Sequence, residues 1–173
     1  MVLLKSENLE LGTPLIKFNL KNIDEKIFYS DSLGEDIVVI AFICNHCPYV
    51  IEMIEDFSKL ALKLQDSVNF ITISANDPDY RSEDSFENMK EFHKKYNFSF
   101  PYLFDESQEI AKKYQAVCTP DIYTYKKIEG EYKLAYHGAF TNLESAITEL
   151  QNDANTVTED KPSIGCSIKW KQN

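Results

Sequence analysis

One apolar run constrains the fold of this chain more than any other feature. Across residues 37–43, β-branched and aromatic side chains follow one another without a polar break. Such a run is typical of a central strand that is buried on both faces. It leads directly into Cys44-Asn45-His46-Cys47-Pro48. Apolar side chains then recur at helical spacing, which predicts a helix over about residues 47–65. A Cys-x-x-Cys motif therefore stands where a buried strand passes into a helix.

The rest of the chain supplies partners for this strand. Two short alternating stretches within residues 13–33 predict an N-terminal β-hairpin. After the motif we expect strand 68–74, helix 83–96, strand 102–105, helix 107–114, antiparallel strands 121–125 and 132–136, and helix 143–150. This order predicts an α/β fold with a mixed central sheet and helices on both faces. We expect one domain over residues 1–150 and a C-terminal tail, 151–173, that packs back on it through Ile164, Ile168 and Trp170.

The charge and hydropathy of the chain exclude several classes of partner. A formal net charge of -10 and an isoelectric point near 4.8 would repel phosphate backbones and anionic lipid surfaces. No stretch approaches the roughly 20 apolar residues that span a bilayer, and the first residues lack the apolar run of a signal peptide. We therefore expect no nucleic-acid partner, no membrane partner and a cytoplasmic location.

The motif has the spacing that dithiol redox chemistry requires. Two intervening residues bring the sulfurs close enough to bond, and the N–H groups that open a helix favour a thiolate. Position alone predicts Cys44 as the exposed nucleophile and Cys47 as the thiol that resolves the mixed disulfide. A protonated His46 beside Cys47 would stabilise the thiolate and shift the couple toward an oxidant. This chemistry needs no cofactor.

A second motif makes the assignment more specific. The sequence Cys118-Thr119-Pro120-Asp121 precedes a predicted strand. Together with the first motif and the order of elements, it resembles the thioredoxin superfamily over roughly residues 13–150. More narrowly, it resembles the redoxin branch, the alkyl hydroperoxide reductase/thiol-specific antioxidant group. The resemblance implies a thioredoxin-like fold, a cis peptide bond before Pro120, and a Thr119 that can pair with an extended substrate chain. We expect Thr119, Pro120 and Asn45 to bind substrate.

The chain departs from two patterns of this superfamily. Thioredoxins carry a buried acid six residues before the first cysteine, where this chain has Val38, so no proton acceptor for Cys47 is evident. Peroxiredoxins carry a Pro-x-x-x-Thr/Ser-x-x-Cys-Pro sequence. Here Ile40 and Cys44 replace its proline and threonine, and Cys47 takes the position of the peroxidatic cysteine. The arginine expected beside the thiolate is missing as well, since none follows Arg81.

These observations favour a thiol-disulfide oxidoreductase that acts in cell redox homeostasis through Cys44 and Cys47. Its expected partners are a disulfide-containing protein or a small thiol or peroxide substrate, together with a thiol electron donor. One alternative is a redoxin-type thiol peroxidase, an antioxidant that reduces hydroperoxides.

A third hypothesis is a soft-metal-binding or redox-sensing domain. In it, Cys44, Cys47 and Cys118 would gather a metal with a histidine. No second Cys-x-x-Cys completes a zinc site, so we assign no metal ligands. Cys118, two residues before Pro120, is a possible auxiliary thiol. We interpret Cys166 as an inert cysteine in a docked tail.

Overall fold

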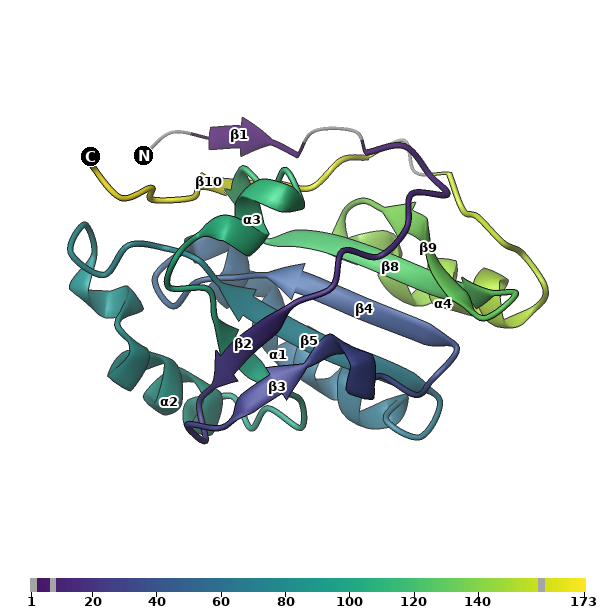
Figure 1. Cartoon of the computed structure of the whole chain (residues 1–173), viewed down its shortest axis with the longest axis horizontal. Helices are drawn as coiled ribbons and strands as arrows, with labels where there is room; N and C mark the ends of the chain where they lie inside the picture. Colours follow the sequence, from purple (N-terminus) through teal and green to yellow (C-terminus); the bar gives the residue numbers. More distant parts are fainter. Residues whose placement is uncertain (1–2, 7–8, 159–160) are drawn as a thin grey trace.

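The computed structural model describes residues 3–6, 9–158 and 161–173. Within these residues the centre is a seven-stranded mixed sheet, in the order β3-β2-β6-β5-β4-β8-β9 (Figure 1). Its strands are β2 (Asn19–Asn22), β3 (Ile27–Tyr29), β4 (Ile37–Phe42), β5 (Val68–Ser74), β6 (Tyr102–Phe104), β8 (Asp121–Ile128) and β9 (Glu131–His137). The helices are α1 (Pro48–Lys63), α2 (Phe86–Lys95), α3 (Glu109–Lys113) and α4 (Leu143–Gln151). The predicted hairpin is present as β2 and β3, which pair antiparallel.

Strand β4 is buried on both faces, as its apolar run predicts. It lies between β5, with which it pairs parallel, and β8, with which it pairs antiparallel. Alternate side chains of a strand point to opposite faces. One set packs in the core that contains α1, α2 and α4: Ile37, Val39 and Ala41. The other set packs in the core that contains α3: Val38, Ile40 and Phe42. Helices therefore cover both faces of the sheet.

The start of α2 differs from the prediction of a helix from residue 83. Residues Ser82–Asp84 form a 3-10 turn, η2, and Ser85 is the N-cap of α2. The Ser85 hydroxyl accepts a hydrogen bond from the backbone N–H of Asn88, at 3.2 Å. An N-cap serine satisfies one of the free N–H groups of the first turn, so it sets the helix start. Asp84 is thereby left outside the helix.

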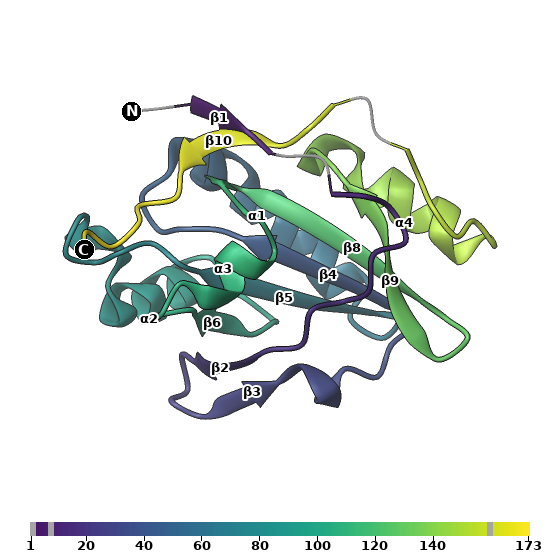
Figure 2. The same ribbon diagram turned by 45° about the horizontal axis from the view of Figure 1, so that its top comes forward.

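Part of the C-terminal tail forms a strand, which the sequence did not indicate. Within the described residues, β10 (Ile164–Ser167) pairs antiparallel with both β1 (Leu3–Lys5) and β7 (Cys118–Thr119). Figures 1 and 2 both show β1 and β10 side by side. Of the predicted anchors, Ile168 is buried and Trp170 is half-buried, whereas Ile164 is 39% exposed. Ile164 is a partial anchor, because its side chain lines the open groove beside α1 together with Pro120 and Phe140.

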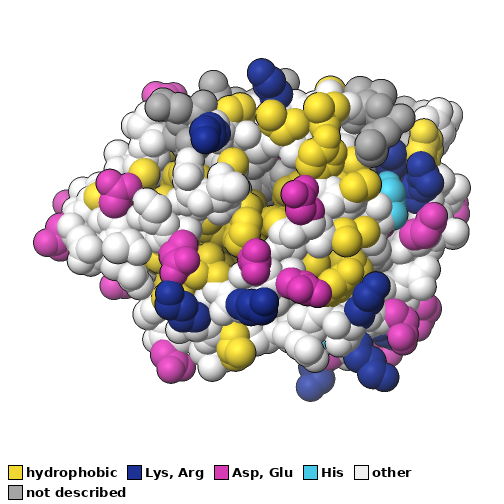
Figure 3. Space-filling view, turned by 180° about the vertical axis from the view of Figure 1, so that it is seen from behind, with side chains coloured by type: hydrophobic (Ala, Val, Ile, Leu, Met, Phe, Trp, Pro, Cys, Tyr) yellow, Lys and Arg dark blue, Asp and Glu magenta, His cyan; other side chains and the backbone are white. Residues whose placement is uncertain are grey.

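The surface carries charges of both signs (Figure 3), although the formal net charge of the chain is -10. Figure 3 shows acidic and basic side chains scattered around exposed apolar ones on the face behind the sheet. A groove of about 670 Å³ lies beside α1, with Pro120 and Phe140 in its lining. None of the helices in the described part of the chain is long and apolar enough to cross a membrane.

Candidate active site

The Cys-x-x-Cys motif lies between β4 and α1. Cys47 is the N-cap of α1 and Pro48 is its first residue, as the sequence predicts. Both Cys44 and Cys47 are 0% exposed. The prediction of an exposed Cys44 is therefore wrong, because Thr119 lies against this sulfur. The distance from Cys44 Sγ to Thr119 Oγ1 is 3.3 Å.

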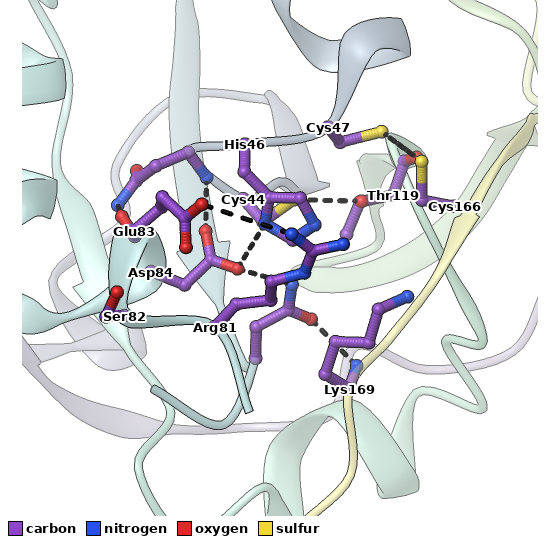
Figure 4. A network of polar contacts seen from close by, with 12 residues as sticks. Cys44, His46, Cys47, Arg81, Ser82, Glu83, Asp84, Thr119, Cys166 and Lys169 are labelled. Carbon is purple, nitrogen blue, oxygen red and sulfur yellow. Dashed lines mark hydrogen bonds and ion pairs between the residues drawn. The ribbon is translucent and has the colours of Figure 1, made fainter. Parts of the chain in front are cut away.

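The two sequence motifs meet at Thr119. The peptide bond between Thr119 and Pro120 is cis, which confirms the prediction. The hydroxyl of Thr119 contacts Cys44, and its carbonyl oxygen lies 3.3 Å from Cys47 Sγ (Figure 4). Pro120 lines the groove beside α1, together with Tyr49 from the first turn of that helix. Thr119 therefore contacts both thiols, and the surface next to it is open to a ligand.

A third cysteine lies at the same place. The distance from Cys47 Sγ to Cys166 Sγ is 3.0 Å, and Cys166 is 1% exposed. Figure 4 shows the two sulfurs pointing toward one another. Cys118, by contrast, directs its thiol at the carbonyl oxygen of Pro120, 4.0 Å away. Burial raises the pKa of the Cys118 thiol, so its surroundings favour an inert thiol over the predicted auxiliary role.

Sequence reasoning missed one residue of the site, Asp84. Its side chain is 0% exposed and comes from η2, which follows β5. Asp84 Oδ1 accepts a hydrogen bond from the backbone N–H of Asn45, at 2.8 Å. Asp84 Oδ2 accepts one from Asn76 Nδ2, at 2.9 Å, and lies 2.5 Å from His46 Nδ1. The site therefore contains a buried acid, although Val38 stands where thioredoxins have theirs.

A topological signal could have pointed to Asp84. Strands β4 and β5 are parallel neighbours, so the loops that follow them emerge at the same edge of the sheet. The Cys-x-x-Cys motif follows β4, and the acidic segment 77–84 follows β5. An acidic side chain in the loop after β5 can therefore reach the Cys-x-x-Cys loop after β4.

His46 contacts a different group from the one predicted. The sequence placed its imidazole beside the sulfur of Cys47. In the structure, a nitrogen of His46, the sulfur of Cys44 and a carboxylate oxygen of Asp84 all lie within 4.8 Å of one another. The contact between His46 and Asp84 orients the imidazole, since a carboxylate partner fixes the ring and its tautomer. The imidazole of His46 therefore lies near the sulfur of Cys44.

Asn45 fixes the loop that carries the cysteines. Its side-chain amide donates to the carbonyl oxygen of Glu83, at 2.9 Å, and its Oδ1 accepts from the hydroxyl of Tyr102, at 2.7 Å. These contacts, with the backbone bond to Asp84, join the loop to η2 and to β6. The predicted role of Asn45 in substrate binding stays a prediction.

The metal-binding hypothesis required a different set of ligands from the one that the structure brings together. Among the described residues, Cys44, His46 and Asp84 are the group whose donor atoms could hold an ion. Cys118 is directed at Pro120 and does not belong to this group. His46 and Asp84 are already partners of one another. The structure therefore brings together a donor group that differs from the one hypothesised.

The two thiols of the motif have unlike electrostatic surroundings. A hydrogen bond with Cys44 lowers the pKa of Cys47, even though burial acts against it, and contacts with Cys166 and the N–H of Val50 add to the effect. The same hydrogen bond raises the pKa of Cys44 well above its usual value, and burial and the charge of Asp84 raise it further. These effects favour the thiolate on Cys47, whereas position alone had assigned the nucleophile to Cys44.

We expect ultraviolet titration of the reduced protein to detect this thiolate. Because the pKa of Cys47 is lowered, its absorbance should persist well below the usual cysteine pKa of about 8.5. Cys47→Ser should abolish that absorbance, and Cys44→Ala should shift its titration upward, since the main hydrogen-bond donor is lost. A titration near 8.5 that Cys47→Ser leaves unchanged would place the thiolate elsewhere.

Comparison with known proteins agrees with the fold and the site. The AhpC/TSA family model matches residues 11–140. An uncharacterized conserved protein from Geobacillus kaustophilus is 35% identical, with a TM-score of 0.94 over 100% of this chain and 98% of that one. A hypothetical protein from Sinorhizobium meliloti is 31% identical, with a TM-score of 0.92 over 98% of this chain and 99% of that one. No curated protein matches the chain.

More distant structures share the fold alone. A secreted disulfide oxidoreductase from Mycobacterium tuberculosis is 19% identical, with a TM-score of 0.63 over 76% of this chain and 95% of that one. The architecture is thus thioredoxin-like, and the residues that the family model matches include both motifs. The chain therefore belongs to the AhpC/TSA family, in the redoxin branch of the thioredoxin superfamily.

Proposed function

We propose that this protein is a thiol-disulfide oxidoreductase in which Cys44 and Cys47 cycle between a dithiol and a disulfide. Membership of the AhpC/TSA family supports a redox function. One feature carries the finer proposal: Cys47 lies at the start of α1, and its hydrogen bond with Cys44 lowers the pKa of Cys47 and raises that of Cys44. A thiolate next to a thiol is the arrangement that disulfide exchange requires.

The first half of the reaction uses the thiolate of Cys47. It attacks one sulfur of a substrate disulfide, whose S–S bond breaks as a mixed disulfide forms. The second substrate sulfur leaves as a thiolate and takes a proton from solvent. The proposal thus reverses the roles predicted from the order of the two cysteines. The groove lined by Pro120 and by Tyr49, from the first turn of α1, offers room for the substrate chain.

The second half uses Cys44 as the resolving thiol. Cys44 must lose its proton, and the His46–Asp84 pair lies within 4.8 Å to accept it. The Cys44 thiolate then attacks the sulfur of Cys47, which forms the Cys44–Cys47 disulfide and releases the second substrate thiolate. An external thiol donor returns the protein to the dithiol. We place this cycle in the cytoplasm, where a thiol pool keeps such a pair reduced.

One observation favours thiol peroxidase activity as the second candidate. The thiolate is on Cys47, which stands at the peroxidatic position of the peroxiredoxin pattern. A second observation weighs against this candidate. The guanidinium of Arg81 lies 4.0 Å from the exposed carboxylate of Glu83, rather than beside a thiolate as the peroxiredoxin pattern requires. The dithiol proposal therefore ranks first.

A single-turnover experiment tests both candidates. Pre-reduced proteins are mixed with oxidised glutathione or with hydrogen peroxide, and the released thiol or the remaining peroxide is measured. Because Cys166 lies next to Cys47, the variants are made in a Cys166→Ser background. Cys118→Ser is the matched control, since its thiol is directed away from the pair.

We expect the background protein to release both glutathione thiols and Cys44→Ser to release only one, because the mixed disulfide on Cys47 then has no resolving thiol. Cys47→Ser should release none. Equal release by all variants would sink the proposal. Rapid peroxide loss that survives Cys44→Ser but not Cys47→Ser, together with slow glutathione reduction, would favour the peroxidase.

A further inference from the structure

The C-terminal strand β10 lies at the edge where an extended substrate chain is expected. It pairs antiparallel with β7, so that Cys166 is opposite Thr119 and Ser167 is opposite Cys118. The role expected for Thr119 is to pair with the backbone of a substrate in this β-augmented manner. In this protein, the edge is already occupied by the chain's own C-terminal segment.

The strand presents a thiol to the reactive sulfur. Cys166 Sγ is 3.0 Å from Cys47 Sγ, although 119 residues separate the two in the sequence. The S–S bond of a disulfide is about 2.05 Å long, so the two sulfurs need to approach by only about 1 Å to bond. The contact lies in the interior, since both cysteines are buried. Cys166 thus stands where the sulfur of a bound substrate would stand.

Gly165 makes this close approach possible. A Cβ at this position would lie 1.8 Å from the carbonyl oxygen of Thr119, the same oxygen that contacts Cys47. Backbone hydrogen bonds hold the tail on either side of Cys166, from Ser6 N–H to the Ser163 carbonyl at 2.9 Å and from Ile168 N–H to the Val117 carbonyl at 3.0 Å. The tail is therefore positioned on the site by several independent contacts.

We propose that Cys166 is a third redox thiol of the site, presented to Cys47 by β10 as a built-in substrate chain. The inference rests on the proposed function, because it needs the reactive thiolate of Cys47. It goes beyond the family assignment, since Cys166 lies outside residues 11–140, which the family model matches.

Cys47 is the sulfur that both exchanges share. In the oxidised protein, the thiolate of Cys166 attacks the sulfur of Cys47. The Cys44–Cys47 bond breaks, the Cys47–Cys166 bond forms, and Cys44 leaves as a thiolate that takes up the proton given up by Cys166. One disulfide is present before and after, so this step consumes no oxidant. Formation of the first disulfide still transfers two electrons and two protons to the substrate disulfide.

The two disulfides have different consequences for the site. With Cys44 and Cys47 joined, the Cys166 thiol stays available on β10. With Cys47 and Cys166 joined, the tail is covalently tied across the Thr119 edge and Cys44 is again a thiol. An extended substrate chain then has no access to that edge. The exchange therefore switches the oxidised site between two forms. In the Cys44–Cys47 form β10 can move away from the Thr119 edge, and in the Cys47–Cys166 form it cannot.

Disulfide mapping tests the inference. The full-length reduced protein is titrated with oxidised glutathione, quenched with acid, alkylated and digested with trypsin without reduction. No lysine or arginine separates Cys44 from Cys47, whereas Cys166 lies in a different tryptic peptide. A Cys47–Cys166 bond therefore cross-links two peptides, and a Cys44–Cys47 bond does not.

We expect the cross-link in a part of the wild-type protein and in most of the Cys44→Ser variant, in which Cys47 has no other partner. The matched control is the double variant Cys166→Ser/Ser167→Cys, which moves the thiol to the neighbouring residue and the opposite face of β10. It should form no cross-link to Cys47.

The possible outcomes separate this inference from the proposed function. Glutathione that stays on Cys47 in Cys44→Ser, while the wild type still forms the Cys44–Cys47 bond, overturns the inference and keeps the oxidoreductase. The cross-link without any Cys44–Cys47 bond in the wild type keeps Cys166 and overturns the proposed dithiol. Equal cross-linking in the control also overturns the inference, because it shows that the position of the thiol is immaterial.

Discussion

Gly165→Ala is expected to lower the unfolding free energy by about 3 kcal/mol, at the upper end of what overpacking costs. The new Cβ would lie 1.8 Å from the carbonyl oxygen of Thr119 and 2.6 Å from its carbonyl carbon. Both obstacles are backbone atoms, so no side-chain rotation relieves the clash. The strand β10 must instead lift away from β7, which breaks the contact between Cys166 and Cys47.

Denaturant unfolding and the rate of thiol alkylation measure this effect. The midpoint should fall, and Cys47 should react faster with iodoacetamide than in the wild type, because the strand that covers it is displaced. Gly34→Ala is the matched control, since a Cβ there meets nothing within 4 Å. If the two variants unfold at the same denaturant concentration and Cys47 stays protected in both, β10 does not cover the site in solution.

The central part of the fold is predictable because its patterns are local. The run of residues 37–43 has no polar break, so only a strand buried on both faces accommodates it, and β4 has this position. The hairpin of β8 and β9 follows in the same way from two alternating stretches around Glu129 and Gly130, which form the turn. In these elements the hydrophobic period and the turn residues agree with each other.

Strands β1 and β10 were not predicted because their stability is not local. Each is at most four residues long, and each depends on a partner from the opposite end of the chain. One signal was present: a glycine next to Cys166 in an apolar tail is typical of a close backbone approach. The burial of Cys47 depends on this distant strand, so the motif alone could indicate only that the sulfurs are near one another.

The roles of the two thiols also could not be read from the motif. Helix position favours a thiolate at the start of α1, but both cysteines are near that end. The difference comes mainly from the hydrogen bond between the two thiols, which raises the pKa of Cys44 and lowers that of Cys47. Burial and the charge of Asp84 add to it at Cys44, and the contact with Cys166 adds to it at Cys47. Asp84 fell within the helix predicted over residues 83–96, because the capping by Ser85 was not recognised.

Asp84→Ala is expected to destabilise the protein by roughly 2–4 kcal/mol, since a buried polar group left without its partner costs about 1–3 kcal/mol and more than one is affected. The substitution removes the acceptor of the Asn45 N–H and of the buried Asn76 amide, and it removes the partner of His46. The loop that carries Cys44 and Cys47 then loses its contacts with the side chain of Asp84 in η2. Glu83→Ala is the matched control. It removes the same negative charge, but from a side chain that is exposed.

The conservative variant Asp84→Asn separates charge from packing. It keeps the shape of the side chain but removes the negative charge that raises the pKa of Cys44 after the effects of Cys47 and burial. The pKa of Cys44 should therefore fall, while the second half of the reaction should slow near neutral pH because the proton acceptor of the His46–Asp84 pair is weakened. Thiol titration and single-turnover release of the second glutathione measure the two effects separately. An Asp84→Asn protein with the titration curve and the release rate of Glu83→Gln would mean that Asp84 serves the fold alone, and the proton from Cys44 would then have to leave by another route.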